Sequence, residues 1–184
     1  MKLRTELVAL LACTLALSAC VTKYPEPQSG DRARLRMART GPSESTEFSV
    51  YPASNVQSCY RQEVGQGDQR LALLDNPLVH YDTNLGIPGR DASGKSRSTE
   101  AYIRAGEPFL LSTFIMAMTT STMYRCSIGA LWTPIPGADY EATVDWTYHA
   151  CKLVVTKIEP GSDNAPAKLP VDARYIRPCK DPAK

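Results

Sequence analysis

The chain has 184 residues, with 21 Lys and Arg against 19 Asp and Glu. Apolar residues make up 43% of it, which excludes an intrinsically disordered chain. The near balance of charge argues against a protein that binds nucleic acid through a basic surface. Length and composition therefore predict one globular domain without a nucleic-acid partner.

The N-terminus has the layout of an export signal. Lys2 and Arg4 precede an apolar run over residues 7–17, which is shorter than the roughly 20 residues that span a bilayer. The run leads into Leu17-Ser18-Ala19-Cys20, which resembles the lipobox of bacterial lipoproteins. That resemblance implies that residues 1–19 are removed as a lipoprotein signal peptide and that Cys20 is acylated. A plain signal peptide cleaved after Ala19 is the alternative.

The residues after the lipobox predict where the chain resides. Val21 stands where Asp would favour retention at the inner membrane, so the resemblance favours the outer membrane, with the protein anchored on its periplasmic side by acyl chains on Cys20. Several acyl chains on one residue give a stable anchor, at about 0.8 kcal/mol per buried methylene. Residues 20–31 are polar and rich in Pro, which predicts a flexible tether.

Alternation of apolar and polar residues predicts strands along the rest of the chain. The segments are 32–37, 47–51, 99–105, 109–119, 125–132, 140–146 and 150–158, with 171–176 as an edge strand, while 71–74 and 78–81 are short apolar runs. Turn-forming residues separate them, and no segment after the signal keeps a helical period. We therefore predict an all-β fold, an antiparallel β-sandwich of about seven to nine strands over residues 32–176, followed by a C-terminal tail over 177–184.

The first predicted strand carries a row of arginines. Ala33, Leu35 and Met37 are expected to face the core, and the alternating residues to face solvent. Those alternating residues are Arg32, Arg34 and Arg36. Their nearness to the tether leaves contact with anionic lipid headgroups as an alternative to a plain solvated face.

The stretch 86–98 holds three Gly and a Pro and predicts a mobile loop. We take its first part as the candidate partner-binding loop: Gly86, Ile87, Pro88, Gly89 and Arg90. Residues 89–96 match the G-x-x-x-x-G-K-[ST] pattern of nucleotide-binding loops, but such a loop needs a strand before it and a helix after it. An alternating strand follows here, so we expect a solvated loop and no nucleotide.

Catalytic signals are weak. Only His80 and His149 are bases at neutral pH, near Asp82 and Asp145 respectively. The triplet at 162–164 matches Ser-Asp-Asn of penicillin-binding enzymes, without the partner motifs that those enzymes need. The sequence thus predicts no catalytic residues, no cofactor and no enzyme activity.

Six Cys are present, of which Cys13 leaves with the signal and Cys20 takes the lipid. The other four are Cys59, Cys126, Cys151 and Cys179. An even count in an exported domain predicts two disulfides, with three alternative pairings. We favour Cys126 with Cys151, because both fall at one end of a hairpin that turns at 134–137, and Cys59 with Cys179. No pair has C-x-x-C spacing, so no metal site is expected.

Several segments together resemble a loose group of uncharacterised proteobacterial lipoproteins with immunoglobulin- or transthyretin-like sandwiches. Besides the lipobox, the resemblance rests on residues 30–36 (GDRARLR), 85–89 (LGIPG), 105–109 (AGEPF) and 136–142 (PGADYEA). It implies an envelope location and a sandwich fold, and no activity.

These observations predict a lipid-anchored, periplasm-facing binding or structural lipoprotein of the bacterial cell envelope, with an envelope protein as its partner. An inhibitor or immunity lipoprotein that blocks an envelope-attacking enzyme is the first alternative. An envelope hydrolase that uses His80 or His149 is the second.

Overall fold

The computed structural model describes residues 22–42, 44–56, 58–60, 69–76, 78, 81–90, 97–118, 120–147, 150–161 and 165–180. The elements of the described chain are β1 (Arg32–Thr40), β2 (Thr46–Tyr51), a 3₁₀ turn η2 (Ala53–Asn55), β3 (Cys59–Tyr60), β4 (Gln69–Leu74), β5 (Ser98–Arg104), β6 (Phe109–Met118), β7 (Met123–Trp132), β8 (Asp139–Thr147), β9 (Ala150–Glu159), β10 (Ala167–Pro170) and β11 (Arg174–Pro178). No helix in these ranges is long and apolar enough to cross a membrane.

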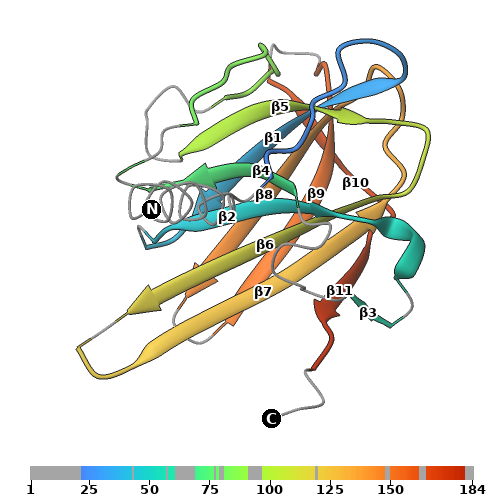
Figure 1. The fold of residues 1–184 in the computed structure, drawn as a ribbon. Coiled ribbons are helices and arrows are strands. Elements are labelled where there is room, and N and C mark those ends of the chain that lie inside the picture. The colour runs from blue at the N-terminus through green and yellow to red at the C-terminus, as the bar shows by residue number, and fades with distance from the viewer. Residues whose placement is uncertain are drawn as a thin grey trace, which may run out of the picture.

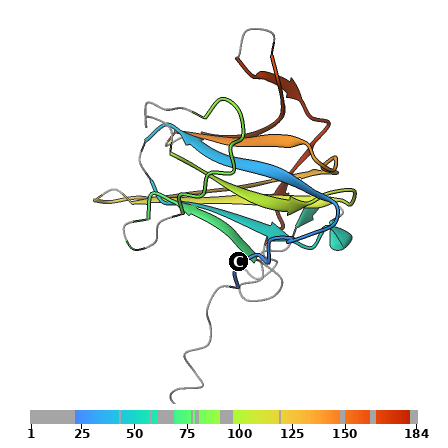
Figure 2. The same cartoon turned by 90° about the horizontal axis from the view of Figure 1, so that it is seen from above.

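Two sheets pack face to face (Figures 1 and 2), which confirms the predicted β-sandwich. One has five strands in the order β10-β9-β8-β1-β5, and the other has six in the order β3-β11-β7-β6-β2-β4. The predicted seven to nine strands were too few. The prediction of a wholly antiparallel sandwich was also too narrow, because β1 pairs with β8 in parallel and β3 pairs with β11 in parallel.

Alternate residues of both sheets fill the core between the layers. In β1 the side chains of Ala33, Leu35 and Met37 are fully buried there, as their spacing predicts. Phe109 of β6 packs edge-on against Trp132 of β7, with ring centroids 5.2 Å apart. The period-two pattern therefore identifies the inner face of each long strand correctly.

Short edge strands escaped the sequence pattern. β10 lies within a stretch predicted as loop, and β3 has only two residues. Both strands are too short for two full alternations, and each is defined by pairing with a distant strand. The short apolar run at 78–81 is not a strand in its described residues, and Leu78 is 90% exposed.

Both predicted disulfides are confirmed. Cys126 of β7 bonds Cys151 of β9 and so joins the two sheets. Cys59 of β3 bonds Cys179, which directly follows β11. The predicted C-terminal tail is therefore wrong at its start, because residues 177–179 belong to the folded body.

The N-terminal segment covers two sheet edges. The Tyr24 amide donates to the Arg70 carbonyl of β4 at 2.8 Å, and the Arg70 amide donates to the Thr22 carbonyl at 2.8 Å. On the other sheet, the Tyr102 amide of β5 donates to the Glu26 carboxylate at 2.9 Å. The flexible tether predicted over 20–31 is thus wrong for residues 22–26. They saturate edge groups that would otherwise invite another strand.

Candidate functional site

An ion cluster lies on the outer face of the five-stranded sheet. Arg36 of β1 stands beside Glu100 of β5 and Glu141 of β8 in the sheet register. Its Nε donates to Glu100 Oε1 at 3.0 Å, and its Nη1 donates to Glu141 Oε2 at 3.2 Å. Its side chain is only 2% exposed. The predicted solvated arginine row is therefore wrong for Arg36, although Arg34 keeps 33% of its side chain exposed.

The segment 81–90 covers this cluster and explains the burial. Arg36 donates to the backbone carbonyls of Ile87 and, at 3.1 Å, of Pro88. Glu100 Oε2 accepts the amides of Leu85 at 2.5 Å and Ile87 at 3.3 Å. A further bond joins Arg34 Nη1 to the Leu85 carbonyl at 2.9 Å. Five backbone groups of an irregular segment are thus held by three charged side chains of the sheet below.

This segment includes the predicted partner-binding loop, and the structure divides its residues into two kinds. Gly86, Pro88 and Gly89 are exposed, whereas the Ile87 side chain is buried. Arg90 pairs with Asp82 at 2.5 Å. The prediction of a mobile loop is therefore wrong for residues 86–88, whose backbone groups are hydrogen-bonded. The rest of the predicted loop, residues 91–96, lies outside the described residues.

Gly89 shows how closely the segment packs. Its φ is +76°, a conformation that side chains other than glycine rarely adopt. A Cβ at this position would also collide with the ring of Pro166, just before β10. The segment therefore contacts both the ion cluster beneath it and the strand connection beside it.

Lys168 of β10 adds a second cation to the cluster. Its Nζ donates to Glu141 Oε1 at 2.5 Å, and its side chain is 48% exposed. Burial alone raises the pKa of the Glu141 carboxyl, but Lys168, then Arg36 and Thr143, outweigh burial and lower the pKa below 4.5. Glu141 therefore stabilises the fold above its unfolded pKa, and this contribution is lost as pH falls through the folded pKa.

We expect Lys168→Met to destabilise the fold modestly near pH 7, by under about 1 kcal/mol because the lysine is half exposed. The loss should shrink as pH falls through the lowered pKa of Glu141, because the carboxyl is then protonated in both variants. Urea unfolding across this pH range measures it. In a Glu141→Gln background the effect of Lys168→Met should no longer depend on pH, and a persistent dependence would assign it to another group.

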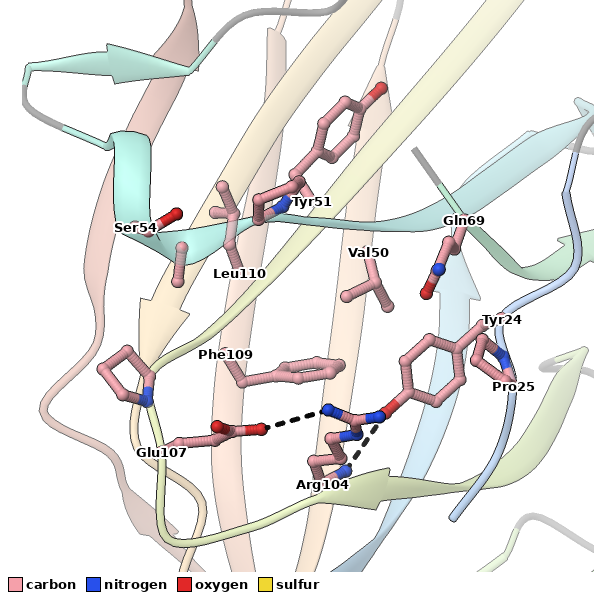
Figure 3. Close-up of a pocket in the computed structure, with 13 residues that line it drawn as sticks. Tyr24, Pro25, Val50, Tyr51, Ser54, Gln69, Arg104, Glu107, Phe109 and Leu110 are labelled. Carbon is pink, nitrogen blue, oxygen red and sulfur yellow. Dashed lines mark hydrogen bonds and ion pairs between the residues drawn. The ribbon is translucent and has the colours of Figure 1, made fainter. Parts of the chain in front are cut away.

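A second feature is a pocket of about 520 Å³ at one edge of the sandwich (Figure 3). Aromatic and proline side chains dominate its walls, among them Tyr24, Tyr51, Pro108 and Phe109. At its rim, Arg104 pairs with Glu107 at 3.7 Å. Its volume falls in the usual range for small-molecule pockets, and its walls suit an apolar or aromatic group.

Sequence reasoning missed this pocket. Tyr24 was assigned to the tether, yet its hydroxyl accepts the Arg104 amide of β5 at 3.1 Å, and burial raises its pKa. The aromatic Tyr24 followed by Pro25 was the signal that the tether has an ordered part, because a solvated linker gains nothing from a large ring.

The other residues that the sequence singled out cannot be placed in the described structure. His80, His149, Lys95 and the triplet 162–164 lie outside the described residues. A strand, β5, follows the glycine-rich match at 89–96, where a phosphate-binding loop needs a helix. Within the described ranges, no group of three or more His, Cys, Asp or Glu is placed to hold a metal.

Comparisons with protein-family models, curated proteins and solved structures found no match to this chain. Its function is therefore argued from the geometry above.

Proposed function

We propose that the protein is a lipid-anchored binding module of the bacterial cell envelope, and that it engages a protein partner through the segment 81–90. The observation that carries this proposal is the set of five backbone groups held by Arg34, Arg36 and Glu100. Fixing an irregular, exposed segment in advance lowers the entropy lost when a partner binds it.

The composition of the cluster supports the same proposal. Burying ion pairs stabilises a fold little compared with apolar residues of similar volume. An apolar outer face covered by an apolar loop would hold the sheet together equally well. The charged groups instead hold five backbone groups of Leu85, Ile87 and Pro88 in place. We infer that the cluster is retained because it fixes the shape of the segment.

Site-specific photocrosslinking in intact cells tests the partner. A crosslinker at Pro88, on the exposed side of the segment, should give one discrete protein adduct. The matched control is Ile135, which is 55% exposed in the turn between β7 and β8 and should give none. Glu100→Gln, which loosens the segment at nearly unchanged volume, should reduce the adduct. Equal products from both positions, or none from Pro88, would reject the proposal.

The anchor is tested separately. Cys20→Ser should leave the chain without acyl groups and release it from the membrane fraction, because the lipid is the only anchor that we propose. Mass spectrometry of the fractionated cells measures both outcomes, with Cys13→Ser as the control that should remain acylated. Acylated Cys20→Ser protein in the membrane fraction would contradict the prediction.

An inhibitor of an envelope-attacking enzyme remains the first alternative. A rigid exposed segment also favours this function, since inhibitors bind enzymes through preorganised loops. The identity of the crosslinked protein separates the two. If it is an enzyme whose rate falls when the purified protein is added, the inhibitor is correct. An assembly partner should co-purify without loss of activity. The hydrolase alternative rests on histidines outside the described residues.

A further inference from the structure

The β6–β7 hairpin extends past its neighbours on the six-stranded sheet (Figure 1). β2 pairs with β6 only as far as Ile115, and β11 pairs with β7 only over residues 129–131. The last pairs of the hairpin are Met116 with Arg125 and Met118 with Met123. Among the described strands of this sheet, none pairs with the outer edges of this end, and its outward-facing side chains are exposed.

Three thioethers share one face of this end. Met116 and Met118 are two residues apart on β6, and Met123 lies directly opposite Met118. Alternation along a strand and cross-strand pairing therefore place all three on the outer face. Their exposed fractions are 41%, 70% and 47%. The fourth methionine of the described chain, Met37, is fully buried in the core, so the exposed ones are gathered at this one place.

The contact made by Met123 shows that its sulfur is used as a polar atom. Arg125 Nε donates to Met123 Sδ at 3.1 Å. The sulfur lone pair thus points along the outer face toward Arg125, the residue that pairs with Met116. An apolar partner on this face would have to bury the guanidinium. A metal ion that binds the Met123 sulfur has only to displace the weak hydrogen bond from Arg125.

We propose that Met116, Met118 and Met123 bind a soft monovalent metal ion, Cu(I) or its analogue Ag(I). Thioethers are soft ligands that select such ions over Zn²⁺ or Ca²⁺. Methionine has three rotatable side-chain bonds, so neighbouring positions on a hairpin can converge on one ion without movement of the backbone. Thioethers release no proton on binding, so the affinity does not depend on pH between about 5 and 8.

Nuclear magnetic resonance of the full chain labelled with ¹³C at the methionine methyl groups tests the site. Addition of Ag(I) should shift the signals of Met116, Met118 and Met123 and leave that of Met37 in place. Zn²⁺ should shift none of them. The methyl readout separates this site from any other soft ligand of the chain, including the Cys20 sulfur. Unshifted signals, or a shift that includes Met37 equally, would overturn the proposal.

Variants sharpen the test. Met116→Leu, Met118→Leu and Met123→Leu combined should abolish the binding, whereas the matched control Met37→Leu should retain it with the same affinity. Arg125→Gln should tighten binding by about two- to fivefold, the size expected for removal of an exposed like charge. Binding that survives the triple substitution, or that weakens on going from about pH 8 to pH 5, would assign the ion to other ligands.

Discussion

Replacing Arg36 with Met should lower the free energy of unfolding by about 3–5 kcal/mol, the usual cost of removing one partner from a buried ion pair. The Glu100 side chain is 0% exposed and Glu141 is 8% exposed, so neither carboxylate can recover its hydration. The segment above would also lose two hydrogen bonds to its carbonyls. Urea unfolding near neutral pH measures the loss.

Two further variants identify the cause of the stability lost in Arg36→Met. Arg34→Met is the matched control, because Arg34 is on the same strand and pairs with Asp139 at 2.6 Å but is one-third exposed. It should cost clearly less than Arg36→Met. Adding Glu100→Gln to Arg36→Met should restore part of the stability, because the uncompensated charge is then gone, whereas Glu141 keeps its pair with Lys168. An equal cost for Arg34→Met and Arg36→Met would show that burial of the cluster is not what matters.

Removing the Cys59–Cys179 disulfide by double substitution with Ala should destabilise the fold by about 4.9 kcal/mol in the chain-entropy model, because the bond closes a separation of 120 residues. Cys126 and Cys151 are 25 residues apart, so removing their bond should cost less, about 3.5 kcal/mol. Denaturant unfolding of the two double variants measures the order of these effects. A larger cost for the shorter loop would contradict the model.

Amide exchange near the Cys59–Cys179 disulfide gives a second test of that prediction. Tyr60, next to Cys59, donates or accepts hydrogen bonds with Ser112 at 2.7 Å and Ser127 at 2.9 Å. It also packs with Leu110 and Ile176 in a small cluster separate from the main core. Without the bridge, β3 is held by non-covalent contacts such as these and by its pairing with β11. Amide exchange at Tyr60 should therefore rise before that of the central strands.

The alternation of apolar and polar residues predicted the fold because successive residues of a strand face opposite sides of the sheet. In β1 the inward residues were identified correctly from spacing alone. The same pattern could not show that Arg36 is buried, since it reveals which residues share a face and not what covers that face. The covering segment 81–90 has no periodicity, and its position is set by bonds to residues far away in the chain.

Contacts between residues far apart in the chain also limited what the sequence could predict. β1 lies beside β8 in parallel, with Arg36 opposite Glu141, and no local turn joins these strands. The pairing of Cys126 with Cys151 is correct, but the hairpin at 134–137 from which it was predicted is wrong, because β7 and β8 lie in different sheets and the bond crosses between them. The pocket was not predictable. Tyr24 lines it from a segment without a strand pattern, and isolated contacts such as the bond between its hydroxyl and Arg104 hold it there.

The fastening of the N-terminal segment limits how far the folded body can stand from the lipid anchor that we propose at Cys20. The Thr22 carbonyl already bonds Arg70 of β4, so only Val21 separates an acylated Cys20 from the folded body. An extended chain covers at most about 3.6 Å per residue, which leaves a reach of roughly 7 Å. A body anchored in this way would lie directly against the bilayer surface. Its partner would have to approach at the membrane, within the first layer of periplasm, and could not be captured across the width of the envelope.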